Sequence, residues 1–215
     1  MNLFERFKKE KEVEKEIDCP VSNPLNLKFN SLIDIKIPEY YDISFKLDSI
    51  EEYKRNIYGK TYEFTDYILK ASGVDNKDVV RLRLVDDEAI ILKEYDSLPY
   101  STDFNNLLLE TENTGQFEII DDATGKVTKS YGRLNNIKHS WGASVRKLVD
   151  ADGNGIITKS DPVSEYGVKY WDFGCEVEEA GVKSTEFLVI EMNGESGWIT
   201  LYIGYFVDLQ SVFII

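Results

Sequence analysis

The stretch that decides the fold is VVRLRLV-DDE-AIILKEY, residues 79–95. Its first half alternates apolar and charged residues with a period of two, which is typical of a half-buried β-strand. The alternation predicts that Leu82 and its apolar neighbours face the core, whereas Arg81 and Arg83 face solvent. Three consecutive acidic residues then favour a turn, so we expect a β-hairpin whose second strand is AIILKEY.

Runs of the same kind occur along most of the chain. In the first third they span residues 25–29, 33–37, 43–47 and 61–71. A further pair lies within residues 116–131 around Gly125, which suits a longer hairpin turn. The last third holds runs at 168–178, 185–192 and 198–207, and it closes on the apolar SVFII (211–215), which we expect to be buried. Short connections between alternating runs predict antiparallel hairpins and a meander.

Helical patterns are fewer. Residues 101–110, STDFNNLLLE, begin with Ser101 or Thr102 as a candidate N-cap and predict a short helix. WGASVRKLV (141–149) places Val145, Leu148 and Val149 on one side of a possible helix.

The N-terminal stretch has a different composition from the rest. After Leu3, Phe4 and Phe7 it is a run of Lys and Glu, which predicts a charged helical arm over residues 1–18 that docks on the body or on a partner. We expect residues 19–215 to form one continuous domain, because no long Gly/Ser/Pro linker interrupts them. The predicted class is β-rich α+β: antiparallel sheets of hairpins and a meander, with a few short helices and the N-terminal helical arm.

Composition limits the classes of partner. The 215 residues carry a net charge of -14, which repels nucleic-acid phosphates and anionic lipid heads and leaves basic proteins and cations as compatible partners. No apolar run reaches the ~18 residues that span a bilayer. The charged N-terminal segment lacks the apolar core of a signal peptide. Cys19 and Cys175 do not have the spacing of a disulfide framework, so we expect a soluble cytoplasmic protein.

Residues 150–161, DADGNGIITKSD, have the spacing of a cation-binding loop. Calcium takes six to eight oxygen ligands, and a loop that supplies them from alternating positions wraps round the ion. Gly155 stands at the sixth position, where such a loop turns sharply. The residues that would supply oxygen ligands are Asp150, Asp152, Asn154, Ile156 through its backbone carbonyl, Thr158 and Asp161.

These twelve residues resemble an EF-hand-type calcium loop. Asp161 replaces the usual glutamate at the last position, as in the dockerin-like variant, and its shorter reach implies weaker calcium binding and leaves Mg²⁺ as a weaker alternative. Pro162 cuts short any outgoing helix, and no second acidic loop is present, so the resemblance implies a structural calcium ion rather than a sensor pair. The alternative interpretation is a glycine-rich turn, in which Asp, Asn and Gly are each expected.

Catalytic motifs are weak. His139 is the single histidine, so a Ser-His or Cys-His catalytic site would need it next to Ser140 or Cys175. No nucleophile-elbow motif surrounds Ser140 or Cys175. Acid pairs such as Asp121 and Asp122 are more typical of solvated turns than of glycosidases. Tryptophans and the tyrosines of KYWDF and LYIGYF are more typical of core pairs, with an aromatic ligand groove as the alternative.

The sequence therefore favours a non-enzymatic soluble interaction or assembly protein with one structural calcium loop. Its partner would be another protein or a second copy of the chain. Two alternatives remain open: a hydrolase-like enzyme that uses acidic residues and an aromatic groove, and a calcium-regulated binding module.

Overall fold

The computed structural model describes residues 25, 27–29, 31–57, 59–73, 79–85, 88–134, 138–149, 159–160, 167–179, 182–194 and 196–215. Within these ranges thirteen strands form one sheet, and every pairing among them is antiparallel. No helix in these ranges is long and apolar enough to cross a membrane.

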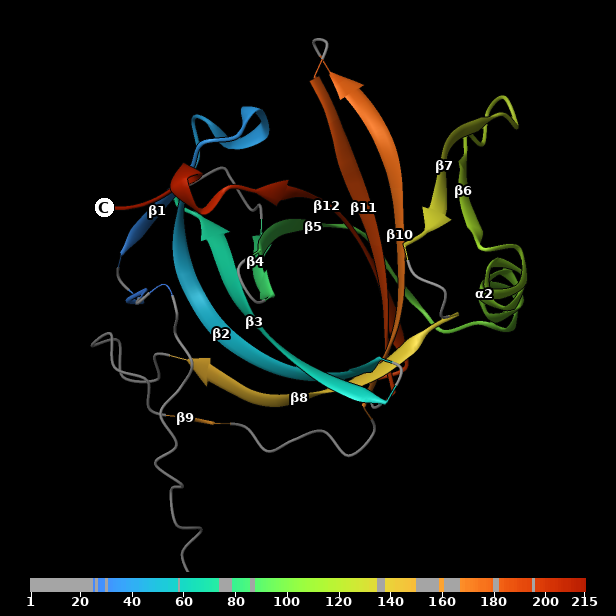
Figure 1. Ribbon diagram of the computed structural model, residues 1–215, viewed down its shortest axis with the longest axis horizontal. Helices are drawn as coiled ribbons and strands as arrows, with labels where there is room; N and C mark the ends of the chain where they lie inside the picture. The colour runs from blue at the N-terminus through green and yellow to red at the C-terminus, as the bar shows by residue number, and fades with distance from the viewer. Residues whose placement is uncertain are drawn as a thin grey trace, which may run out of the picture.

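Eight strands of the sheet close on themselves into a ring, which Figure 1 shows. In ring order they are β2 (Ser44–Ile57), β3 (Lys60–Ala71), β4 (Val79–Val85), β5 (Glu88–Pro99), β12 (Trp198–Val207), β11 (Val182–Asn193), β10 (Val168–Glu179) and β8 (Ser140–Val149). The ring closes because β8 pairs with both β10 and β2. A closed sheet of eight strands is just narrow enough for side chains to fill its interior.

Gly142 lets β8 approach both neighbours. A Cβ at this position would lie 2.6 Å from the Lys54 carbonyl oxygen on β2 and 2.9 Å from Cε2 of Tyr170 on β10. Both distances are shorter than a carbon atom tolerates, so the closure requires glycine at this position.

Strand β2 belongs to two parts of the sheet. A β-bulge at Asp48 divides it, because the register with β3 shifts between Leu47 and Ser49. The residues before the bulge pair with β1 (Leu32–Ile35), which pairs with β13 (Val212–Ile214), whereas the residues after it pair with β8. The bulge therefore lets one long strand join a short three-stranded extension to the closed ring.

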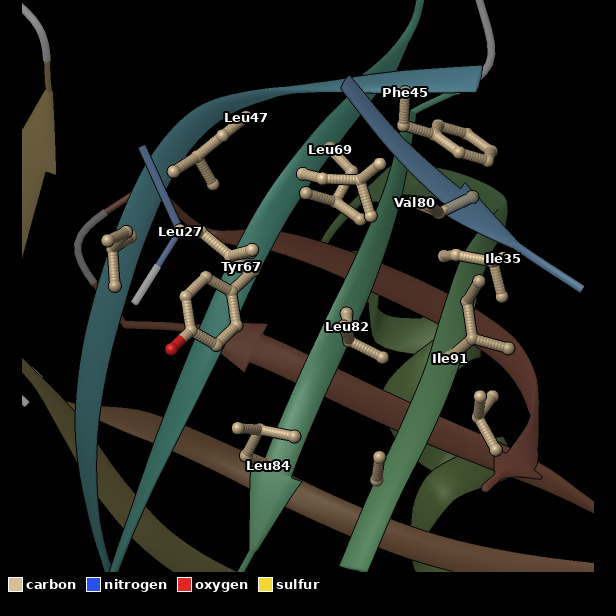
Figure 2. Close-up of a cluster of buried hydrophobic side chains, with 14 of the residues drawn as sticks. Leu27, Ile35, Phe45, Leu47, Tyr67, Leu69, Val80, Leu82, Leu84 and Ile91 are labelled. Carbon is tan, nitrogen blue, oxygen red and sulfur yellow. The ribbon is translucent and has the colours of Figure 1, made fainter. Parts of the chain in front are cut away.

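The outer face of the ring carries two apolar cores. The first lies over β2–β5, where β1 and the segment around Leu27 cover it, as Figure 2 shows. Tyr67, Leu69, Val80 and Leu82 are fully buried in it. Because β1 covers these side chains, every second position of the strands beneath it is apolar.

The second outer core lies over β10–β12. It is covered by the helix α2 (Thr102–Thr114) and by the hairpin of β6 (Gln116–Ile120) and β7 (Val127–Arg133), at the right of Figure 1. The Ser101 hydroxyl accepts a hydrogen bond from the Phe104 N–H and caps the helix, which ends at Gly115 with φ of 73°.

The remaining elements are short. They are the two-residue strand β9 (Lys159–Ser160), which pairs with the end of β8, and two 3₁₀ turns, η1 (Pro38–Tyr40) and η2 (Leu209–Ser211).

The predicted α+β class is wrong, although the chain is rich in β-structure. Across the described ranges α2 is the one α-helix, and it agrees with the prediction for residues 101–110. The stretch 141–149, predicted as a helix, is the strand β8, because its backbone pairs with β2 over eight residues. The predicted helical arm over residues 1–18 lies outside the described residues.

Two further expectations need correction. Residues 27–29 are not in a strand, although Leu27 and Phe29 are buried. The C-terminal SVFII forms β13 but stays accessible, since Phe213 and Ile214 are each 50% exposed and Ile215 is 70% exposed. The described part of the chain therefore covers these apolar side chains only in part.

Candidate functional site

The interior of the ring is charged, which the alternating pattern did not predict. Arg83 lies inside it and donates from Nε and Nη2 to the two carboxylate oxygens of Asp66, at 2.8 Å each. Arg83 Nη2 also lies 2.8 Å from Glu191, and Arg81 lies 3.0 Å from the same carboxylate. Two strands separate β4 from β11 in the ring, so these contacts cross its interior.

A second set of polar contacts crosses the interior elsewhere. Arg55 on β2 forms an ion pair with Asp172 on β10 and donates to the Ser140 hydroxyl on β8. Its guanidinium lies 4.7 Å from the centre of the Tyr170 ring. Phe64 packs edge-on against Tyr170 at 6.4 Å. We call these charged and aromatic side chains the interior cluster.

Each arginine of the interior cluster is neutralised by carboxylates. Burial would lower the pKa of Arg83, but Asp66 and Glu191 hold it well above its ordinary value. The same balance of burial against Glu191 raises the pKa of Arg81. Arg81 and Arg83 therefore stay charged inside the ring, and carboxylates compensate their charges.

The first open site lies on the outer face, between the two covers. It is a hollow of about 380 Å³ over β5, β12 and β11, and we call it the Glu186 hollow. Its lining residues are Glu39, Tyr40, Ile91, Lys93, Glu94, Tyr95, Lys129, Glu186, Ile203, Gly204 and Tyr205. Tyr205 belongs to the LYIGYF stretch, for which an aromatic groove was the alternative interpretation.

Glu186 accepts hydrogen bonds from four side chains, one of them a long bond of 3.9 Å from the Cys175 thiol. Lys129 Nζ donates to both carboxylate oxygens at 2.7 and 2.8 Å, and the hydroxyls of Tyr131 and Tyr205 donate at 2.5 and 2.6 Å. Burial alone would raise the pKa of Glu186, but these bonds and the Lys129 charge hold it below its ordinary value. Glu186 is therefore ionised at neutral pH, with both oxygens already engaged.

Two groups next to Glu186 also have shifted pKa values. Burial and the neighbouring carboxylate raise the pKa of the Tyr131 hydroxyl and of the Cys175 thiol. A thiol with a raised pKa is a poor nucleophile at neutral pH. Cys175 therefore lacks the lowered pKa of a reactive cysteine, and hydrogen bonds hold the Glu186 carboxylate in place.

His139 lies in a different part of the outer face. Its Nδ1 lies 2.7 Å from Glu112, which also accepts from Lys169 Nζ and Trp171 Nε1 at 3.0 Å each. Burial would raise the pKa of Glu112, but the two donated hydrogen bonds lower it.

The predicted nucleophiles do not join this histidine. The Ser140 hydroxyl accepts from Arg55 in the interior. Cys175 is five residues along β10 from Tyr170, the partner of Ser140, which is roughly 17 Å at about 3.4 Å per residue. Among the acid pairs, Asp121 caps its own turn by accepting from Thr124.

The second open site lies between the helix α2 and the strand β6. It is a hollow of about 320 Å³, and we call it the α2–β6 groove. Its lining residues are Leu107, Glu110, Thr111, Thr114, Gln116, Glu118 and Ile120. The lining includes two carboxylates and no basic side chain.

The predicted metal site lies almost wholly outside the described residues. Asp150, Asp152, Asn154, Ile156, Thr158 and Asp161 are not described, whereas Lys159 and Ser160 are. Lys159 pairs with Val149, so the described residues on either side of positions 150–158 are neighbours in the β8–β9 ladder. Within the residues that are described, no group of three His, Cys, Asp or Glu side chains is placed to hold a metal ion.

Sequence reasoning missed both open sites. Glu186, Glu110 and Glu118 occur at positions where a carboxylate normally faces solvent. The sequence predicted only the helix next to β6, through the Ser101 N-cap that begins α2.

No family model matches the chain, and neither a curated protein nor a solved structure matches it.

Proposed function

We propose that this chain is a non-enzymatic interaction protein. The observation that carries the proposal is the acidic α2–β6 groove, which lies beside a strand that ends the sheet. The carboxylates of Glu186, Glu112 and Asp66 each accept hydrogen bonds from neighbouring side chains, which supports a structural role for them. The proposal also places the protein in the cytoplasm, because its two cysteines have no framework spacing.

The interaction proposal is tested by site-specific photo-cross-linking in the native cells. A benzophenone side chain replaces Glu118 on β6 or Phe213 on β13, the two ends of the strand order, and replaces the exposed Glu63 on β3 as a control. We expect an adduct with a discrete protein from an end strand and none from position 63. The partner is identified by mass spectrometry and must then bind the purified chain in calorimetry.

The absence of adducts at both end strands, or adducts of equal yield at position 63, would sink the interaction proposal. Adducts that contain only a second copy of the chain identify self-association as the interaction.

The proposal includes a structural calcium ion in the 150–161 loop. Its support is the spacing of oxygen ligands from Asp150 to Asp161 and the Val149–Lys159 pairing, which brings the two ends of the loop together. An ion bound there would tie the end of β8 to β9 and oppose the opening of that ladder.

Calcium binding is tested by thermal unfolding in EDTA and in added calcium. Binding to the native state alone adds about 2.7 kcal/mol at a hundredfold excess over Kd, so the Tm of the wild type should rise and that of Asp150→Ala should not. Magnesium in place of calcium should give a smaller rise. Identical melting curves for wild type and Asp150→Ala at millimolar calcium would rule the site out.

A further inference from the structure

The strand β6 has one edge that no described strand pairs with. It ends the strand order, with β7 on its other side. Arg133 N–H donates to the Gly115 carbonyl, which fixes the side of β6 that bonds to β7. On the opposite side, the Thr114 hydroxyl accepts from the Gln116 N–H and donates to the Gln116 carbonyl.

Backbone groups alternate in direction along an antiparallel strand. Since those of Gln116 point away from β7, those of Glu118 and Ile120 point the same way. The Asp121 N–H agrees with this phase, because it donates back towards the hairpin, to the Lys126 carbonyl. The open edge of β6 therefore presents the backbone donors and acceptors of Glu118 and Ile120, whereas those of Gln116 bond to the Thr114 hydroxyl.

The helix α2 lies alongside this open edge. Leu107, Glu110, Thr111 and Thr114 recur at helical spacing and line the α2–β6 groove together with β6. Figure 1 shows α2 next to the end of the hairpin at which β6 begins. An edge strand flanked by a helix, with a groove between them, is a geometry that accepts an added strand.

The charge of the groove selects the occupant. Glu110 and Glu118 are exposed, the groove has no basic lining residue, and the chain carries a net charge of -14. Ile120 and Leu107 are 53% and 42% exposed and offer apolar contact to the aliphatic part of a long side chain. A lysine or arginine on an extended segment matches both features.

We infer that the α2–β6 groove binds an extended basic segment of a protein partner, which adds as a strand to the open edge of β6. This inference rests on the proposed interaction function and names the partner class at its site. Backbone hydrogen bonds supply the docking, and Glu110 and Glu118 supply the preference for Lys or Arg at alternate positions.

The test uses a ten-residue peptide that alternates lysine and threonine, with binding to the full chain measured by fluorescence anisotropy. One control peptide has glutamate for lysine, and a second has proline for the central threonine, which removes a ladder donor. We expect the lysine peptide to bind at least about tenfold tighter than either control.

Variants of the chain separate charge from backbone pairing. Glu110→Gln and Glu118→Gln should each weaken binding by up to about fivefold, as expected for an exposed charge pair, and the matched control Glu63→Gln should not. Glu118→Pro should weaken binding beyond Glu118→Gln, because it also removes the N–H that points away from β7. Hydrogen exchange on the wild type should show that the peptide protects the Glu118 amide.

Strand addition is overturned if the proline peptide binds as well as the threonine peptide, or if the Glu118 amide gains no protection. No binding at about 1 mM peptide also overturns it. If cross-links still form at Phe213 on β13, these results contradict strand addition and leave the proposed interaction function intact. If no cross-links form at either Glu118 or Phe213, both the interaction function and strand addition are contradicted.

Discussion

The two faces of strands β3 and β4 hold the molecule together by different means. On the outer face, Tyr67 and Leu82 are opposite each other and pack under β1. On the inner face, Asp66 and Arg83 are opposite each other and form an ion pair, and Arg83 also pairs with Glu191 from across the ring. The apolar side of an alternating strand therefore indicates a buried face, whereas its charged side need not face solvent.

The largest effect should come from removing a charge from the inner face. Arg83→Met removes the guanidinium, whose carbon lies 4.4 Å from the centre of the Phe64 ring, and leaves Asp66 and Glu191 without this partner. Breaking a buried ion pair costs about 3–5 kcal/mol, and we expect a loss of that size in urea unfolding. A loss below about 1 kcal/mol would show that the interior is hydrated and would contradict a stabilising role for the charges of the inner face.

A slightly smaller effect should follow from a cavity on the outer face. Leu82→Ala removes a fully buried side chain from the core under β1 and should cost about 3 kcal/mol of unfolding free energy. The volume-conserving Leu82→Met serves as the control and should cost less than about 1.5 kcal/mol. If both substitutions cost the same, the outer face is not close-packed.

Leu82 and Arg83 also show which parts of the fold could be predicted from the sequence. The strand at 79–85, the hairpin with 89–95 and the meander from 168 to 207 were predicted correctly, because apolar residues at every second position are a direct consequence of one buried face. The exposed position predicted for Arg83 is wrong, since it is 4% exposed. A single strand's pattern contains no information on whether a sheet closes, and closure is what buries the charged face.

The strands missed from the sequence have the same explanation. The second half of β2 carries Glu51, Tyr53 and Arg55 towards the interior, so it lacks the apolar alternation that identified the other strands. β8 was predicted as a helix because its pairing partners, β2 and β10, are distant in the sequence.

The open sites were hidden for a related reason. The carboxylates of the α2–β6 groove matter through an open strand edge, and an edge is a property of the assembled sheet.

A buried carboxylate on the outer face tests whether burial, rather than the interior location, makes a charge important. Glu186→Gln leaves Lys129, Tyr131 and Tyr205 with a poorer acceptor and should cost about 1–3 kcal/mol at pH 7.

The cost of Glu186→Gln should also depend on pH. Because the folded-state pKa of Glu186 lies below its ordinary value, its contribution is fully present above the unfolded-state pKa of about 4.3 and is lost as the pH falls through the folded-state pKa. The difference between variant and wild type, measured by urea unfolding from pH 7 downwards, should therefore shrink below about pH 4.3. A difference that stays constant or grows on acidification would contradict this role.

The smallest effect should come from an ion pair with water on both sides. Lys54 lies 2.7 Å from Glu63 on the outer face, one residue from the buried Tyr53, and the two side chains are 52% and 69% exposed. Exposed pairs contribute less than about 1 kcal/mol, so Lys54→Ala should move the urea midpoint little, and added salt should remove most of the shift. Arg83→Met should keep its effect in the same salt, because the charges it unpairs are buried. A loss for Lys54→Ala as large as that for Arg83→Met would mean that position in the ring does not decide the strength of an ion pair. The distinction between the two faces would then reduce to packing alone.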